Sequence, residues 1–254
     1  PVLPQLTEIG SRRGFTTDES ECLLPMYCGG WDPDAPTTAN GYITREKYIE
    51  LLRYAGERHI RVIPEIDMPG HMRAAKKAMG NLLTDSAFDA RVYKSAQNYT
   101  DNVIDVTKPY AVEFIDHVIT EIVKMHEEAN HPLTIFNIGG DEVPRDQWQQ
   151  SPAAQSFMKQ HGMRRESEIQ DYFTHFCAEV LRKHGRRMVG WDEIMCAPKL
   201  PQDAVVMAWR SMGHARIAAT RGHDIILSPI QSFYFNFPQD TNEGDPFYSG
   251  LTGF

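Results

Sequence analysis

The stretch LTIFNIGGDEV (residues 133–143) decides the fold, because it joins an apolar run to a glycine pair and two acids. The apolar part, residues 133–138, has the length and the aromatic and β-branched content of a buried strand. The segment before it predicts a long helix that opens at Pro109, a favoured residue in the first turn of a helix. A helix followed by a buried strand is the repeating unit of a parallel α/β fold.

The same unit recurs on both sides of this stretch. Upstream, Thr44 is a plausible N-cap for a helix that turns Tyr48, Ile49, Leu52 and Tyr54-Ala55 toward a core. Downstream, the apolar pattern predicts a helix over 168–184, with Gly185 suited to the position just past its end, and a shorter helix over 215–221. Five strands are predicted in total, at 62–66, 133–138, 188–191, 205–209 and 225–228.

Length and composition agree with a single domain over residues 1–254. The chain has 41% hydrophobic and 24% charged residues, which is ordinary for a packed globular protein, and its length suits one (β/α)8 barrel. The net charge of −8 disfavours nucleic acid and anionic membranes as partners. The apolar runs are of strand length, far below the roughly 20 residues that span a bilayer. No linker-like stretch marks a boundary between domains.

Side chains that could do chemistry follow the predicted strands at their carboxyl ends. In parallel α/β folds these ends meet at one edge of the sheet, so we expect the side chains to share a pocket. Acids combined with aromatic rings suit a sugar, because aromatic faces stack on pyranose rings while acids bind hydroxyls and move protons. Phosphate is disfavoured, because only Arg210 among these residues is cationic. The set is Glu65, Asp67, His71, Asp141, Glu142, Trp191, Asp192, Glu193, Trp209, Arg210, Tyr234 and Asn236.

The adjacent acids Asp141 and Glu142 are the most informative pair in this set. Two neighbouring carboxylates repel each other, so we expect at least one raised pKa, which suits a general acid. Neighbouring side chains on a strand point to opposite faces, so both acids can face a pocket only where the strand gives way to a loop. Gly139 and Gly140 allow the backbone to pass close to a ligand or to another strand.

Five ordered motifs resemble the β-N-acetylhexosaminidases of glycoside hydrolase family 20. They are IPEIDMPGH at 63–71, IGGDEV at 138–143, GWDE at 190–193, VMAW at 206–209, and SP at 228–229 with YFN at 234–236. The segment LPQL at 3–6 with Gly10 resembles the region that follows the family's first barrel strand. The resemblance implies a (β/α)8 TIM barrel, and we expect this chain to lack the first and last strands of that barrel.

The resemblance also implies an activity, namely exo-hydrolysis of terminal N-acetylglucosamine or N-acetylgalactosamine from glycans or chitooligosaccharides. The reaction would retain configuration, with the substrate's own 2-acetamido group as nucleophile and with no cofactor or metal. Glu142 would be the general acid and then the general base, and Asp141 would accept the acetamido N–H. Tyr234 would donate a hydrogen bond to the acetamido carbonyl oxygen, while Trp191 and Trp209 would wall the acetamido methyl and the sugar ring.

Three further residues have roles that the resemblance implies less directly. Asp67 and His71 match residues below the catalytic acid, where they would set the pKa and rotamer of Glu142. A purely structural role for His71 is an equally good interpretation. Asn236 stands where the family commonly has an aspartate that contacts a sugar hydroxyl, so hydroxyl recognition is expected to differ. The family's arginine that grips the sugar, and a third pocket tryptophan, have no counterpart in these 254 residues.

These departures keep other hypotheses open. The first is a carbohydrate-binding remnant without turnover. The second is an ordinary glycosidase with Glu65 or Glu193 as nucleophile, and the third is a metal-dependent barrel hydrolase that uses Asp67, His71 and Asp141.

Other features of the sequence are weaker. Cys22 and Cys28 either close a small disulfide ring or are buried thiols. By resemblance we expect a location outside the cytoplasm and an additional N-terminal domain in the parent protein. The choice between the two hexosamines stays open.

Overall fold

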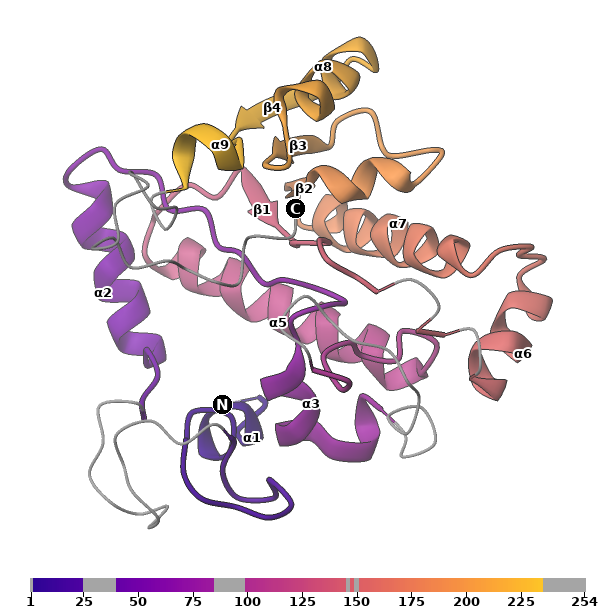
Figure 1. Cartoon of the computed structure of the whole chain (residues 1–254). Coiled ribbons are helices and arrows are strands. Elements are labelled where there is room, and N and C mark those ends of the chain that lie inside the picture. The colour runs from indigo at the N-terminus through magenta and orange to yellow at the C-terminus, as the bar shows by residue number, and fades with distance from the viewer. Residues whose placement is uncertain (1, 25–39, 85–98, 145–146, 149–150, 235–254) are drawn as a thin grey trace, which may run out of the picture.

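The structure is a computed structural model that describes residues 2–24, 40–84, 99–144, 147–148 and 151–234. It is an α/β fold whose four parallel strands lie side by side in chain order, as successive strands of a (β/α)8 barrel do (Figure 1). Four of the five predicted strands are therefore confirmed, with ends that shift by a few residues. The strands are β1 (Ile135–Asn137), β2 (Arg187–Trp191), β3 (Val205–Ala208) and β4 (Asp224–Leu227).

The strand predicted at 62–66 is not a regular strand. It is an extended segment that joins β1 through a single parallel bridge between Glu65 and Asn137. The Ile66 amide donates to the Asn137 carbonyl at 3.0 Å, and the Asn137 amide donates to the Pro64 carbonyl at 3.0 Å. Pro64 has no N–H to donate, so the ladder cannot extend regularly through this position. The segment still lies beside β1 and delivers the residues that follow it to the same edge as the strands.

Two long helices contribute a large share of the core beside the sheet. They are α5 (Pro109–Glu128), which begins at the predicted proline, and α7 (Ser167–Lys183). The helix α5 packs on α7, and α7 packs on β2 (Figure 1). Gly185 has φ +69° just past the end of α7, as predicted, because a left-handed residue there lets the chain turn away. Their buried apolar side chains are Ala111, Phe114, Ile115, Ile119, Val123, Ile169, Phe173, Cys177, Ala178, Val180 and Leu181.

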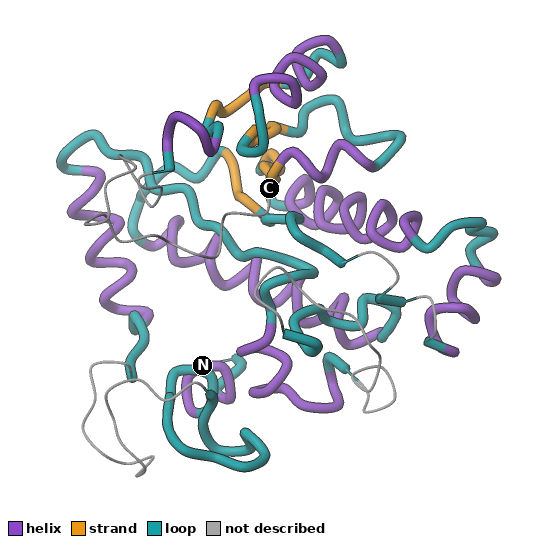
Figure 2. Tube along the Cα trace, in the orientation of Figure 1, coloured by secondary structure: helices purple, strands orange, loops and turns teal. Residues whose placement is uncertain are grey.

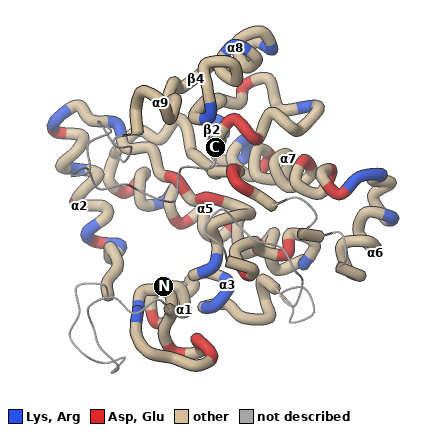
Figure 3. The backbone as a smooth tube through the Cα atoms, viewed as in Figure 1, with Lys and Arg blue, Asp and Glu red and all other residues tan. Residues whose placement is uncertain are grey.

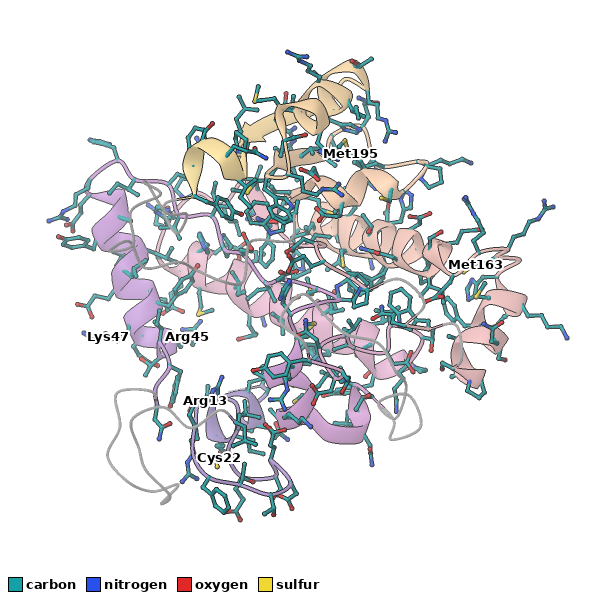
Figure 4. All side chains as sticks on the ribbon, viewed as in Figure 1. Arg13, Cys22, Arg45, Lys47, Met163 and Met195 are labelled. Atoms are coloured by element: carbon teal, nitrogen blue, oxygen red, sulfur yellow. The ribbon has the colours of Figure 1, made fainter. Side chains whose placement is uncertain are left out.

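The first predicted helix is α2 (Arg45–Gly56), which packs on α5. Thr44 caps it, because its side chain accepts a hydrogen bond from the Lys47 amide at 3.2 Å. Arg45 and Lys47 extend from this first turn (Figure 4). Leu52 is buried as predicted, but the prediction for Tyr54 is wrong: it is 58% exposed and stacks under the Arg58 guanidinium.

The remaining helices are short, and most were not predicted. A segment of one or two turns carries too few apolar positions for its period to be read. The helix α8, predicted over 215–221, begins three residues earlier and packs on β3 and β4. None of the described helices is long and apolar enough to cross a membrane. The short helices are α1 (Gln5–Glu8), α3 (Arg73–Met79), η1 (Gly80–Leu82), α6 (Pro152–Gln160), η2 (Asp192–Cys196), α8 (Met212–Thr220) and α9 (Ile230–Phe233).

Loops make up much of the chain around the short strands (Figure 2). Basic and acidic residues are interspersed along the helices and loops (Figure 3). In the N-terminal loop, Arg13 and Cys22 lie close together, where Arg13 forms a bridge with Leu23 (Figure 4). Cys28 lies outside the described residues, so its pairing with Cys22 stays a prediction.

Candidate active site

The carboxyl ends of the strands and of the extended segment bring most of the predicted site residues together. Asp67 and His71 come from the loop after the extended segment, and Asp141 and Glu142 from the loop after β1. Trp191 ends β2, Trp209 directly follows β3, and Tyr234 directly follows α9. Asn236 lies outside the described residues.

His71 is the centre of the acid cluster. Its Nε2 atom lies 3.3 Å from Asp141 Oδ2, 3.3 Å from Glu142 Oε2 and 3.9 Å from Asp67 Oδ2. The carboxylate of Asp141, and next that of Glu142, raise the pKa of His71 to about 10. The imidazole is therefore protonated at neutral pH, and its positive charge faces both members of the acid pair.

Asp67 is the acid whose ionisation is opposed by its surroundings. Burial, and then the negative charge of Asp141, raise the pKa of Asp67 to about 9. Its Oδ1 atom accepts a hydrogen bond from the Gly140 amide at 3.1 Å, which ties it to the loop of the acid pair. Asp67 thus keeps its proton at neutral pH and anchors that loop.

The loop of the acid pair has an unusual backbone that explains why two neighbours share one pocket. Gly139, Gly140 and Glu142 have φ values of +70°, +91° and +49°. A Cβ atom on Gly139 would lie 2.6 Å from the Asp67 Cα, and one on Gly140 would lie 2.8 Å from the Ile194 Cγ2. The two glycines therefore let the loop run tightly between these residues, and its left-handed turns bring both acids to His71.

Three aromatic side chains form a wall beside the acids. The Trp191 and Trp209 rings meet edge to face, with centroids 6.5 Å apart, and Trp209 stacks on Tyr234 with centroids 6.3 Å apart. Burial first, and then the negative charges of Asp141 and Glu142, raise the pKa of Tyr234. The phenol therefore keeps its proton as a hydrogen-bond donor, close to the acid pair.

Two neighbouring acids hold the second tryptophan and the arginine of the predicted set. Asp192 is buried and accepts hydrogen bonds from the backbone amides of Trp209 and Arg210 at 3.0 and 3.1 Å. Its other oxygen pairs with the Arg210 guanidinium, so the charge of Arg210 is committed within the protein. Glu193 accepts from Trp209 Nε1 at 3.0 Å, and burial raises the pKa of Glu193 to about 7.

Two residues of the site were missed by the sequence analysis. Asn137, the last residue of β1, is 3% exposed and donates to Glu65 Oε2 at 2.6 Å. Gln170 on α7 donates to the Gly140 carbonyl at 3.0 Å. A polar residue at the end of an apolar strand was an available signal for Asn137. The sequence carries no such signal for Gln170, because glutamine is common on the polar face of an amphipathic helix.

The oxygen and nitrogen atoms of Asp67, His71 and Asp141 lie within 4.8 Å of one another, close enough to share a cation. The acids around His71 raise its pKa to about 10, so a cation at this site would have to displace the imidazole proton before it could bind there.

Comparison with known proteins places this geometry in context. Residues 1–252 match the family described as glycosyl hydrolase family 20, catalytic domain. A beta-hexosaminidase of Vibrio furnissii is 37% identical over 244 residues, covering 96% of this chain and 38% of that protein. The N,N'-diacetylchitobiase of Vibrio harveyi is 40% identical over 164 residues, covering 56% of this chain and 18% of that protein.

Solved structures of such enzymes also resemble this chain. The crystal structure of a GH20 exo beta-N-acetylglucosaminidase from Vibrio harveyi in complex with N-acetylglucosamine matches with a TM-score of 0.85 at 38% identity. That match covers 97% of this chain and 36% of the other. The Flavobacterium johnsoniae chitobiase matches with a TM-score of 0.63 at 29% identity, over 76% of this chain and 29% of that one. The chain thus spans less than two fifths of the length of these relatives.

Proposed function

The chain belongs to glycosyl hydrolase family 20, and we propose that the protein is an exo-acting β-N-acetylhexosaminidase that releases terminal N-acetylglucosamine or N-acetylgalactosamine. Its parallel α/β fold is that of the family's (β/α)8 barrels. One observation carries the proposal: the neighbours Asp141 and Glu142 both reach the protonated His71, next to an aromatic wall. Chitooligosaccharides and N-acetylhexosamine-terminated glycans are the proposed substrates, and the complex of the Vibrio harveyi enzyme favours N-acetylglucosamine.

The adjacency of the two acids argues for a nucleophile that belongs to the substrate. In an ordinary retaining glycosidase, two carboxylates about 5 Å apart flank the scissile bond, one as acid and one as nucleophile. Asp141 and Glu142 instead lie in one turn of a loop and share His71 Nε2. In this arrangement Asp141 steers the acetamido group by accepting its N–H, and it stabilises the positive charge that develops there.

The first chemical step breaks the glycosidic bond. The acetamido carbonyl oxygen forms a bond to the anomeric carbon while the bond to the leaving oxygen breaks, and Glu142 gives that oxygen its proton. The positive charge of His71, 3.3 Å away, stabilises the Glu142 carboxylate that proton donation leaves behind. In the second step this carboxylate takes a proton from water, and the water oxygen attacks the anomeric carbon as the acetamido oxygen leaves. Two inversions at the same carbon give net retention.

The aromatic wall explains how the acetamido group is held for attack. Trp191 and Trp209 meet nearly at right angles, which leaves two apolar faces for the acetamido methyl and the sugar ring. Tyr234 donates a hydrogen bond from its phenol O–H to the acetamido carbonyl oxygen, and its raised pKa keeps the phenol protonated.

The proposal is tested with Glu142→Gln on two substrates with different leaving groups. The leaving group of N,N'-diacetylchitobiose is a sugar hydroxyl, which must receive a proton. We therefore expect kcat/KM for this substrate to fall by about 10²–10⁴-fold, the range of general acid–base catalysis. The first step with 4-nitrophenyl N-acetyl-β-glucosaminide needs less acid help, so its kcat/KM should fall less. Glu50→Gln, on the exposed surface of α2, is the matched control.

Normal hydrolysis of the disaccharide by Glu142→Gln would contradict the assignment of the acid. If the unaltered protein binds N-acetylglucosamine in calorimetry but hydrolyses neither substrate, the carbohydrate-binding alternative holds instead.

A further inference from the structure

We propose that Glu65 is a positioning residue of this site, one that couples Trp191 of the aromatic wall to the loop of the acid pair through Asn137. The inference rests on the proposed function for its meaning, because the wall and the acids act on one substrate. Glu65 takes no part in the chemical steps described above, so this positioning role is an addition to the proposed function.

A closed ring of hydrogen bonds carries the inference. Glu65 Oε1 accepts from Trp191 Nε1 at 3.3 Å, and Glu65 Oε2 accepts from Asn137 Nδ2 at 2.6 Å. Asn137 Oδ1 then accepts from the Gly139 amide at 3.0 Å, and the Gly139 carbonyl accepts from the Trp191 amide at 2.8 Å. Gly139 opens the loop that carries both acids, so the ring fixes the wall and the acids relative to each other.

With asparagine at position 137, the ring requires a carboxylate at position 65. Both groups that face Glu65 are donors, so each of its oxygens must accept. The side-chain amide of Asn137 cannot rotate by 180° to present its oxygen to position 65, because that oxygen already accepts a hydrogen bond from the Gly139 amide. Asn137 is 3% exposed, so water cannot substitute for a lost partner at its side chain.

The alternative that Glu65 is the nucleophile of an ordinary glycosidase gives a different expectation. A nucleophile must be a carboxylate, whatever its neighbours donate. A positioning residue needs only that the ring stays closed. An exchange of amide and carboxylate between positions 65 and 137 separates the two, because it keeps the bonds of the ring and removes the carboxylate from position 65.

The test uses Glu65→Gln, Asn137→Asp and the double variant that combines them. In Glu65→Gln the single carbonyl oxygen can accept from only one of the two donors, so one hydrogen bond of the ring is lost, and we expect kcat/KM for 4-nitrophenyl N-acetyl-β-glucosaminide to fall by about 10- to 100-fold. In the double variant the introduced glutamine donates its amide proton to the introduced aspartate, which still accepts from the Gly139 amide. The carbonyl oxygen of that glutamine accepts from Trp191, so the ring is closed again. We expect kcat/KM to return to within about threefold of the unaltered protein.

A second readout follows the ring without any turnover. The ¹H–¹⁵N signal of the Trp191 indole, identified by its absence in Trp191→Phe, should move in Glu65→Gln and move back in the double variant. Unchanged kcat/KM together with an unmoved indole signal in Glu65→Gln would overturn the inference. So would a double variant whose indole signal is restored but which stays inactive, because the carboxylate itself would then be required. If the unaltered protein hydrolyses nothing, the proposed function fails, while the indole signal still decides whether the ring exists.

Discussion

Replacing Gly139 by alanine tests whether the tight passage of the acid loop past Asp67 shapes the site. Gly139 has φ +70°, and an added Cβ would lie 2.6 Å from the Asp67 Cα, a backbone atom that cannot rotate away. The loop or the segment of Asp67 must therefore shift. Gly162 is a matched control, because it has φ +66° and nothing lies within 4 Å of its added Cβ.

The expected cost has two parts. An alanine in the left-handed region costs about 1 kcal/mol or slightly more, and this part applies to both variants. Overlap with packed atoms adds about 1–3 kcal/mol, and this part applies only to Gly139→Ala. We therefore expect the free energy of unfolding to fall by about 1 kcal/mol in Gly162→Ala and by about 2–4 kcal/mol in Gly139→Ala.

Urea unfolding of the two variants and the unaltered protein measures this difference directly. In thermal unfolding, each kcal/mol corresponds to about 2–4 °C for a chain of this size. We also expect kcat/KM to fall in Gly139→Ala and to stay unchanged in Gly162→Ala, because only the first displaces Asp141 and Glu142. Stability losses that agree to within about 0.5 kcal/mol, with full activity in both variants, would refute the reasoning.

Two other predictions concern the histidine of the acid cluster and the core under α2. The pKa of His71 is raised from 6.5 to about 10. The stabilisation that its ion pairs add to the free energy of unfolding is therefore complete below pH 6.5 and is lost as the pH rises toward 10. The stability difference between the unaltered protein and His71→Gln, measured by urea unfolding, should therefore shrink from about pH 6 to about pH 10, and a constant difference would contradict it. Leu52→Ala, at a fully buried position, should lower the free energy of unfolding by about 2–5 kcal/mol. The matched change Leu51→Ala, at a neighbouring side chain that is 42% exposed, should lower it by less than about 0.5 kcal/mol. Similar melting temperatures for these two variants would show that α2 does not bury the face described.

The long elements could be predicted because their patterns are long enough to read. The apolar period of α5, the proline at its start and the glycine after α7 are local signals, and the structure confirms them. The short helices α3 and α6 carry too few periods for such a signal. The segment 62–66 looked like a strand from its composition, although Pro64 was a visible signal against a regular ladder. Its single bridge to β1 could not be predicted, because the local sequence does not encode which distant segment lies beside it.

The site was predictable only in outline. Asp67, His71 and the acid pair could be grouped because each follows an element of the parallel sheet. The partners of Glu65 and Glu193 could not be predicted, because they depend on the register between distant segments. The bridge between Glu65 and Asn137, for example, places two side chains in contact that are 72 residues apart.

The most direct test of the central claim is whether the acetamido group of the substrate does the attacking. The measurement is kcat/KM of the unaltered protein toward the 4-nitrophenyl β-glycosides of N-acetylglucosamine and of its N-trifluoroacetyl analogue. Fluorine withdraws electrons from the carbonyl oxygen and weakens it as a nucleophile. We predict a fall on the order of a hundredfold, about 2.7 kcal/mol in the barrier. Equal kcat/KM for the two substrates would contradict the account, because a protein carboxylate would then be the nucleophile.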